Sequence, residues 1–125
     1  MLIGAERILK AFEDYGKEYF ISWKSEEISD FLKEKQTETA AVLMSGDCGF
    51  YSGAQKLINA LKDYETEIIC GISSPVYFCS KIKKTWQNMR FISLHGNNEN
   101  IIRNICRNEY CFFLLGGDVT VDEIC

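Results

Sequence analysis

The stretch Ala40–Ala54 carries side chains that could do chemistry. It opens with an apolar run and breaks into a glycine-rich turn that holds the carboxylate of Asp47, the thiol of Cys48 and the phenol of Tyr51. Glycine lets a backbone approach a ligand closely, as Gly46 would here, and Asp47 could bind a hydroxyl pair, an ammonium group or a backbone amide. The turn is therefore a candidate ligand site. The alternative is that Asp47 only caps the helix that follows.

Two other turns carry candidate groups. Ser73 and Ser74 place two hydroxyls at a predicted helix start, where they would either contact a ligand or cap the helix. His95 could act as a general base, or it could be a structural residue or a substrate contact. A thiol near a helix N-terminus can be activated, but the sequence identifies no histidine partner that would make Cys48 a nucleophile.

The sequence lacks the motifs of several common phosphate-binding and metal-binding sites. No Walker A loop and no G-x-G-x-x-G motif is present, so a phosphate-binding loop is not predicted. The six cysteines form no C-x-x-C pair and only one histidine accompanies them, which gives no zinc-ligand pattern and no expected metal. We expect reduced, mostly buried thiols.

The composition indicates one globular domain. The 125 residues are 46% hydrophobic with a single proline, and the net charge of -4 argues against a nucleic-acid surface. No apolar run is long enough to span a membrane, and the N-terminus lacks the order of a signal peptide. We expect a cytoplasmic protein with neither a nucleic-acid nor a membrane partner.

Apolar periodicity alternates between helix and strand along the chain. After a short apolar start at 1–3, helices are expected at 5–15, from 25 onward with Ser25 as the cap, and at 55–64, 76–82 and 101–105. Ile101, Ile102 and Ile105 would form the apolar face of the helix at 101–105, and a last helix could begin at 121–125. Strands are expected at 18–23, 39–44, 66–70, 91–94 and 110–115. The alternation predicts an α/β fold, with a mostly parallel sheet of about five strands and helices on both faces.

The unusual residues follow the predicted strands. They occupy four turns, at 45–53, 71–74, 95–98 and 116–118. Open α/β sheets bind ligands beyond the carboxyl ends of their strands, so four such turns favour a ligand site at one sheet edge.

Four motifs, in order, resemble those of the tetrapyrrole (corrin/porphyrin) methylases. Residues 45–51 (SGDCGFY) are similar to the family's SGDPGFYG signature, and 71–74 (GISS) to the end of its PGISS motif. Residues 93–96 (SLHG) and 3–9 (IGAERIL) resemble the SLHG and GAERLL segments of one branch. That branch is the precorrin-6Y and cobalt-precorrin-7 carbon-5 methyltransferases of cobalamin synthesis.

The resemblance implies methyl transfer from S-adenosylmethionine to a ring carbon of a corrin precursor, a small-molecule tetrapyrrole. Matching positions imply that Gly46, Asp47, Cys48 and Tyr51 line the cofactor, and that Ser73 and Ser74 reach its carboxylate or sulfur end. On the substrate side the candidates are His95 and Asn97. Such a transfer works largely by positioning, so the catalytic residues stay unassigned.

The sequence also departs from the family pattern. Cys48 and Cys70 stand where the family usually has proline, and no GxGPG loop is present. The chain therefore resembles an incomplete N-terminal domain over residues 1–125, lacking the first strand, and we expect it to be inactive as a methyltransferase by itself.

Two other functions stay open. The first is a non-catalytic binding or interaction module derived from the same family, and the second is an unrelated Rossmann-like nucleotide-binding domain. Because a missing strand would leave a sheet edge open, we also expect a homodimer.

Overall fold

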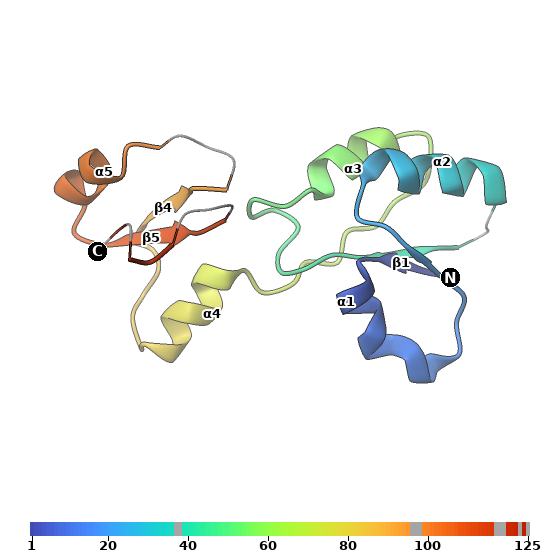
Figure 1. The fold of residues 1–125 in the computed structure, drawn as a ribbon, viewed down its shortest axis with the longest axis horizontal. Coiled ribbons are helices and arrows are strands. Elements are labelled where there is room, and N and C mark those ends of the chain that lie inside the picture. The colour runs from blue at the N-terminus through green and yellow to red at the C-terminus, as the bar shows by residue number, and fades with distance from the viewer. Residues whose placement is uncertain (37–38, 96–98, 117–119, 123, 125) are drawn as a thin grey trace. The chain divides into compact units, whose positions relative to one another are not determined.

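The structure is a computed structural model that describes residues 1–36, 39–95, 99–116, 120–122 and 124. The chain divides into two compact units, Met1–Ser73 and Ser74–Cys125. The first unit contains β1 (Leu2–Gly4), α1 (Glu6–Leu9), the 3-10 helix η1 (Lys10–Tyr15), β2 (Tyr19–Ile21), α2 (Ser25–Lys35), β3 (Ala41–Leu43) and α3 (Ala54–Ala60) (Figure 1). The second contains α4 (Ser74–Lys81), β4 (Arg90–Ser93), α5 (Ile101–Arg107) and β5 (Cys111–Leu114).

A three-stranded parallel sheet organises the first unit, in the order β2-β1-β3. Ile3 of the central strand pairs with Phe20 on one side and with Val42 on the other, so the three side chains lie on one face. The chain passes from β1 to one neighbour and later returns to the other side of β1. The strand order therefore reverses between β1 and β3.

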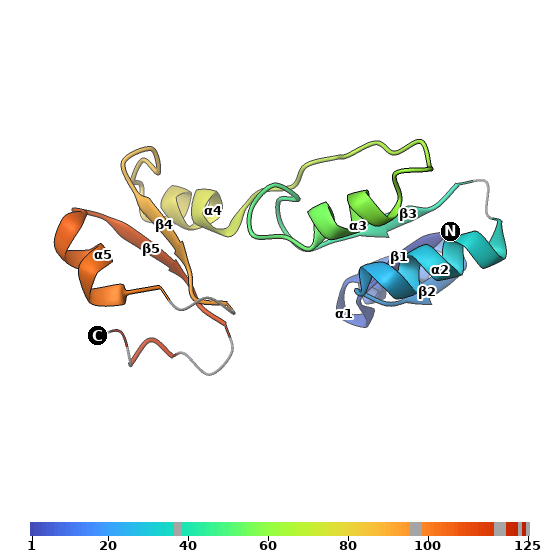
Figure 2. The ribbon, with the colours of Figure 1, turned by 90° about the horizontal axis from the view of Figure 1, so that it is seen from above.

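Helices cover both faces of this sheet, as predicted. The helices α2 and α3 lie on one face and α1 lies on the other (Figures 1 and 2). The core between the sheet and the helices α2 and α3 centres on Ile3, which is fully buried. Its other buried members are Ile28, Leu32, Leu57 and Leu61. Leu9 of α1 is buried separately.

The second unit pairs β4 with β5 in parallel, and α5 makes the connection between them. Phe112 of β5 contacts two aromatic rings edge-on, Phe78 of α4 at 5.7 Å and Phe91 of β4 at 6.2 Å between ring centroids. Asn100 caps α5 by accepting a hydrogen bond of 2.8 Å from the backbone N–H of Arg103.

The α/β class with parallel strands is confirmed, and most predicted elements are present. Four of the five predicted strands correspond to β2, β3, β4 and β5, and the predicted helices correspond to α1 with η1 and to α2, α3, α4 and α5. Gly16 ends η1 in the left-handed conformation (φ 58°), as expected of a C-cap glycine. The five strands formed by the described residues lie in two sheets, of three and two strands. The single incomplete domain over 1–125 stays a prediction.

The predicted strand at 66–70 is wrong. No strand is formed there, and Ile68 and Ile69 are 55% and 82% exposed. An apolar run becomes a strand only when neighbouring strands accept its backbone hydrogen bonds, and none of the described strands does so. The fifth strand is instead β1, which is only three residues long and was expected as no more than an apolar start.

Three smaller expectations are also wrong. Ser25 is the first residue of α2 and not its cap. The expected apolar stripe of α5 is not buried, because Ile102 and Ile105 are 76% and 45% exposed. Five cysteines are free in the described part of the chain, but only Cys79 of these is buried. The possible last helix at 121–125 falls partly outside the described residues.

No described helix is both long enough and apolar enough to cross a membrane. Among the described residues, no cluster of histidine, cysteine, aspartate or glutamate is suited to hold a metal ion.

Candidate functional site

The turn after β3 is held by its own backbone and by Asp47. Gly46 adopts a φ of +75°, which L side chains rarely take. Asp47 Oδ1 accepts a hydrogen bond of 2.8 Å from the backbone N–H of Gly49, and the Asp47 carbonyl accepts one of 3.1 Å from Phe50. This is an Asx-type turn. Asp47 therefore shapes the turn and does not cap α3, whose N-cap residue is Gly53.

The turns at 45–53 and 71–74, which the sequence places after separate predicted strands, meet in the structure. A Cβ atom on Gly71 would collide with the backbone carbonyl of Gly46. A Cβ on Gly46 would lie 3.8 Å from the carbonyl of Ile72, and its positive φ also disfavours any side chain. Two backbones therefore run against each other at this point, with no side chain between them.

The other predicted cofactor residues are placed near these turns in the chain. Cys48 is half-buried, and Tyr51 is 54% exposed with a φ of +45°, an uncommon conformation for a bulky residue. Ser73 is buried and closes the first unit, and Ser74 is exposed and begins α4. The capping of α4 by these serines stays a prediction.

His95 lies in the second unit, directly beyond β4. A Cβ on Gly116, which follows β5, would collide with the His95 ring. The structure thus brings the turns after β4 and β5 together at these two residues. Asn97, the other predicted substrate residue, lies outside the described residues.

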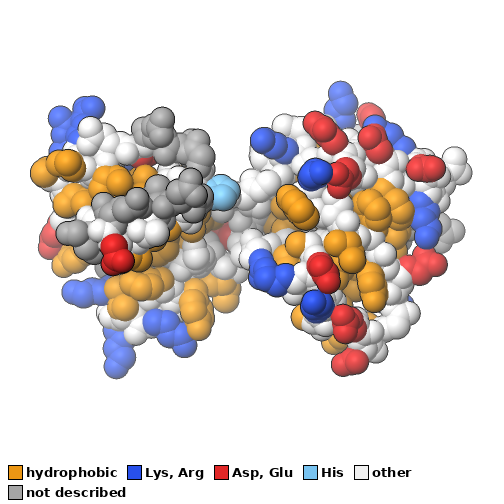
Figure 3. Space-filling model, viewed as in Figure 1, with side chains coloured by type: hydrophobic (Ala, Val, Ile, Leu, Met, Phe, Trp, Pro, Cys, Tyr) orange, Lys and Arg blue, Asp and Glu red, His pale blue; other side chains and the backbone are white. Residues whose placement is uncertain are grey.

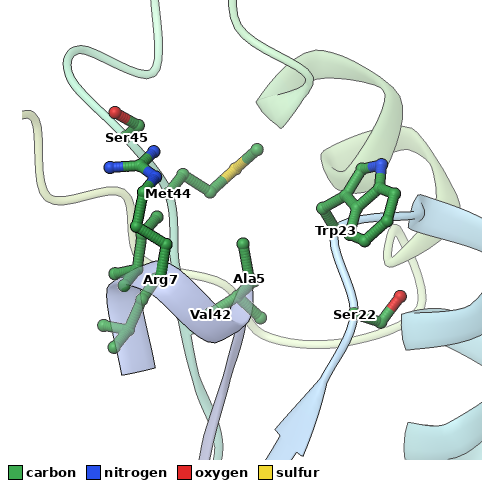
Figure 4. Close-up of a pocket in the computed structure, with 9 residues that line it drawn as sticks. Ala5, Arg7, Ser22, Trp23, Val42, Met44 and Ser45 are labelled. Carbon is green, nitrogen blue, oxygen red and sulfur yellow. The ribbon is translucent and has the colours of Figure 1, made fainter. Parts of the chain in front are cut away.

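A pocket of about 200 Å³ opens at the carboxyl ends of the three strands of the first unit. Figure 4 shows Arg7 and Ser45 on one side and Trp23 on the other, with Ala5 and Met44 between them. Ile8, Ser22, Val42 and Leu43 complete the lining. The pocket lies where the strand order reverses, the position at which parallel α/β sheets bind ligands.

The sequence reasoning missed Arg7 and Trp23. Both lie within three residues of the end of a strand. This signal was available for Trp23, which is the last residue of the predicted strand 18–23. For Arg7 the signal was hidden, because β1 was not recognised as a strand. Their meeting follows from the strand order β2-β1-β3, which the pattern of apolar residues does not determine.

A small polar network fixes the chain beside Trp23. The buried Ser22 hydroxyl donates to Glu27 Oε2 at 2.7 Å and accepts from the Lys24 backbone N–H at 3.1 Å. Lys24 Nζ contacts Glu27 Oε1 at 2.6 Å. Hydrogen bonds from Lys24 and then Ser22 hold the pKa of Glu27 below its ordinary value, and Glu27 in turn raises the pKa of Lys24.

Comparison with known proteins tests the resemblance to the tetrapyrrole methylases. No family model matches the chain. The sequence is 29% identical over 123 residues to the "Probable cobalt-precorrin-7 C(5)-methyltransferase" of Methanocaldococcus jannaschii, an alignment that covers 91% of this chain and 58% of that protein. The crystal structure of the cobalamin biosynthesis precorrin-6Y methylase from Archaeoglobus fulgidus matches with a TM-score of 0.67 at 18% identity.

That structural match covers 99% of this chain and 64% of the methylase. The chain thus spans somewhat under two thirds of the length of either protein. The predicted resemblance is confirmed on two separate grounds, sequence for the first protein and fold for the second. The chain is thus similar in sequence to a protein named as a probable cobalt-precorrin-7 methyltransferase, and similar in fold to a precorrin-6Y methylase.

Proposed function

We propose that this chain is the N-terminal part of an S-adenosylmethionine-dependent methyltransferase that methylates a ring carbon of a corrin precursor in the cytoplasm. The observation that carries the proposal is the contact between the turns at Gly46 and Gly71. These are the two turns whose sequences resemble the cofactor-binding motifs of the tetrapyrrole methylases. Relatives named for precorrin methylation support the substrate class.

The residues at these turns fit a cofactor cradle. Gly46 and Gly71 leave backbone groups uncovered by side chains, and the tied turn at Asp47 keeps its second carboxylate oxygen available for a ribose hydroxyl or an ammonium group. Cys48, Tyr51, Ser73 and Ser74 would complete the cradle. When bound, S-adenosylmethionine supplies an electrophilic methyl group.

The protein's part in the reaction is to position the acceptor. A ring carbon held in line with the methyl group gains rate from proximity and orientation alone, so no covalent protein nucleophile is required. His95 and Asn97 are proposed to contact the substrate. The collision that any side chain at 116 would make with His95 supports a fixed place for this ring.

Calorimetric titration with S-adenosylhomocysteine tests the proposal. It is done on this chain and on the Methanocaldococcus methyltransferase with its matched stretch replaced by residues 1–125. We expect binding by the chimera that Gly71→Ala weakens about tenfold or more, because the new Cβ displaces the Gly46 turn. Gly53→Ala is the control, since its Cβ would meet Met44 at an ordinary 3.6 Å. Absence of binding in both proteins would contradict the proposal.

A second candidate function is a binding module that retains the cofactor cradle but does not transfer a methyl group. Cys48 and Cys70, in place of the prolines usual in the family, favour it because proline would restrict the backbone of both turns. Methyl transfer by the chimera to a corrin precursor excludes this candidate, whereas cofactor binding without transfer supports it.

We also infer that the chain self-associates. Ile68, Ile69 and Ile72 are exposed in a segment that forms neither helix nor strand. The strands β2 and β3 each have one unpaired edge in the described sheet. Light scattering should report a dimer, and a monomer over a wide concentration range would contradict this inference.

A further inference from the structure

The pocket of the first unit contains groups that the proposed cofactor cradle does not use. Arg7 and Trp23 form opposite walls, and Ala5, Val42 and Met44 give it an apolar floor (Figure 4). A cation facing an aromatic ring across an apolar floor suits a ligand that is flat, largely apolar and negatively charged at its edge.

The charge of Arg7 is not neutralised within the described part of the chain. No carboxylate there forms an ion pair with its guanidinium, and the neighbouring Glu6 contacts Lys10 instead, at 3.5 Å. A guanidinium presents its N–H donors in a fixed fork that matches a carboxylate with two hydrogen bonds. Arg7 is therefore free to bind an anionic ligand group.

The exposure of Trp23 is unusual for such a large apolar side chain. It is 71% exposed, and none of the described ring pairs includes it. Its backbone is nevertheless held on both sides, because the backbone N–H of Ser22 donates to the Gly4 carbonyl and the backbone N–H of Lys24 donates to the Ser22 hydroxyl. An indole held at a pocket wall and left uncovered can pack on a flat ligand without a large loss of conformational freedom.

The pocket is too small for a whole large ligand. Its volume of about 200 Å³ lies below the roughly 300–1,000 Å³ of sites that enclose a complete drug-sized molecule. It would therefore hold one side arm and leave the rest of the ligand outside. Ser45 lines the pocket and directly precedes Gly46, so the pocket adjoins the turn proposed to hold the methyl donor.

We propose that this pocket binds a carboxylate-bearing side arm of the methyl acceptor. Arg7 pairs with the carboxylate, and Trp23 packs on the flat edge of the macrocycle from which the arm extends. The identity of the acceptor as a corrin precursor rests on the proposed function. Beyond that function, we infer that the pocket recognises the carboxylate arms at the edge of the acceptor. It would bind an acceptor with free carboxylate arms more tightly than one whose arms are amides.

Two corrin probes test this selectivity on the 125-residue chain. Cobyrinic acid carries free carboxylate arms, and cobinamide carries the same kind of arms as amides. The Trp86→Phe variant leaves Trp23 as the single tryptophan, so saturable quenching of its emission reports binding at the pocket. We expect quenching by cobyrinic acid with an affinity about tenfold or more above that for cobinamide, because a charged hydrogen-bonded pair is lost with the amide.

Matched variants assign the effect to Arg7. In the Trp86→Phe background, Arg7→Gln should weaken cobyrinic acid about tenfold or more and remove the preference over cobinamide. Arg107→Gln removes the same charge from α5, outside the pocket, and should leave both affinities unchanged. Equal effects of the two substitutions, equal affinity for the two probes, or no saturable quenching would each overturn the inference.

Calorimetry with S-adenosylhomocysteine on the chimera that keeps Arg7 separates the two proposals. If this chimera binds the cofactor but shows no preference for the carboxylate probe, only the pocket inference is overturned. If neither this chimera nor the 125-residue chain binds the cofactor, the proposed function is overturned.

Discussion

The first unit of the chain has a larger buried apolar core than the second. The first has three strands covered by helices on both faces and a core around Ile3. The second has two strands, and its helices α4 and α5 keep large apolar residues at the surface (Figure 3). These are Val76, Tyr77, Phe78, Ile102 and Ile105.

This difference indicates where the stability of the chain resides. Two strands are marginal in water unless a further strand or helix covers them, whereas three strands with a packed face can be stable. We infer that the first unit supplies most of the folding free energy. The exposed apolar residues of α4 and α5 in turn indicate a surface that gains stability by being covered.

The largest expected effect comes from the core of the first unit. Ile3→Ala should lower the free energy of unfolding by about 2–5 kcal/mol, because it leaves a cavity beneath α2 and α3. Ile102→Ala removes the same atoms from α5, where the residue is 76% exposed. This substitution should change the free energy of unfolding by no more than about 0.5 kcal/mol. Urea denaturation measures both, and equal losses would refute the comparison.

A smaller loss of stability is expected when alanine replaces Gly71 or Gly116, and the loss should differ between the two. Gly71→Ala places a Cβ against a backbone carbonyl, which has little room to move, whereas Gly116→Ala places one against the His95 ring. The two substitutions should cost about 1–3 kcal/mol of overpacking at most, with Gly71→Ala at the upper end. Thermal unfolding measures the costs.

The NMR signals of the His95 ring provide the local readout for the second unit. Gly116→Ala should shift them, and Gly71→Ala should not. A larger destabilisation by Gly116→Ala than by Gly71→Ala would contradict the expected order.

The smallest effect concerns the exposed network beside Trp23. The pKa of Glu27 is lowered from its ordinary 4.5 by Lys24 and Ser22, so its ionised form stabilises the fold. This contribution is fully present above pH 4.5 and is lost as the pH falls through the lower folded pKa. Acid titration should show wild type and Glu27→Gln differing at neutral pH and converging below that window. A constant difference at all pH values would argue against this assignment.

The sequence predicted the alternation of elements because apolar periodicity is a local property. It also placed the turns at Gly46 and Gly71 at one edge, and the structure brings them into contact. It failed at 66–70, because apolar content does not show whether a partner strand is present. β1 was missed since three residues are too few for periodicity, and with it the pocket wall at Arg7.

The contact between Gly46 and Gly71 links two positions that lie 25 residues apart in the sequence. A side chain at position 71 would have to enter space held by the carbonyl of position 46, and position 46 itself is confined to glycine by its backbone conformation. A substitution at Gly71 therefore has to move the turn at Gly46, whereas a substitution at Gly46 strains its own backbone. In a random mutagenesis library, surviving substitutions at Gly71 should be accompanied by second-site changes within residues 45–47, and unaccompanied ones should be rare.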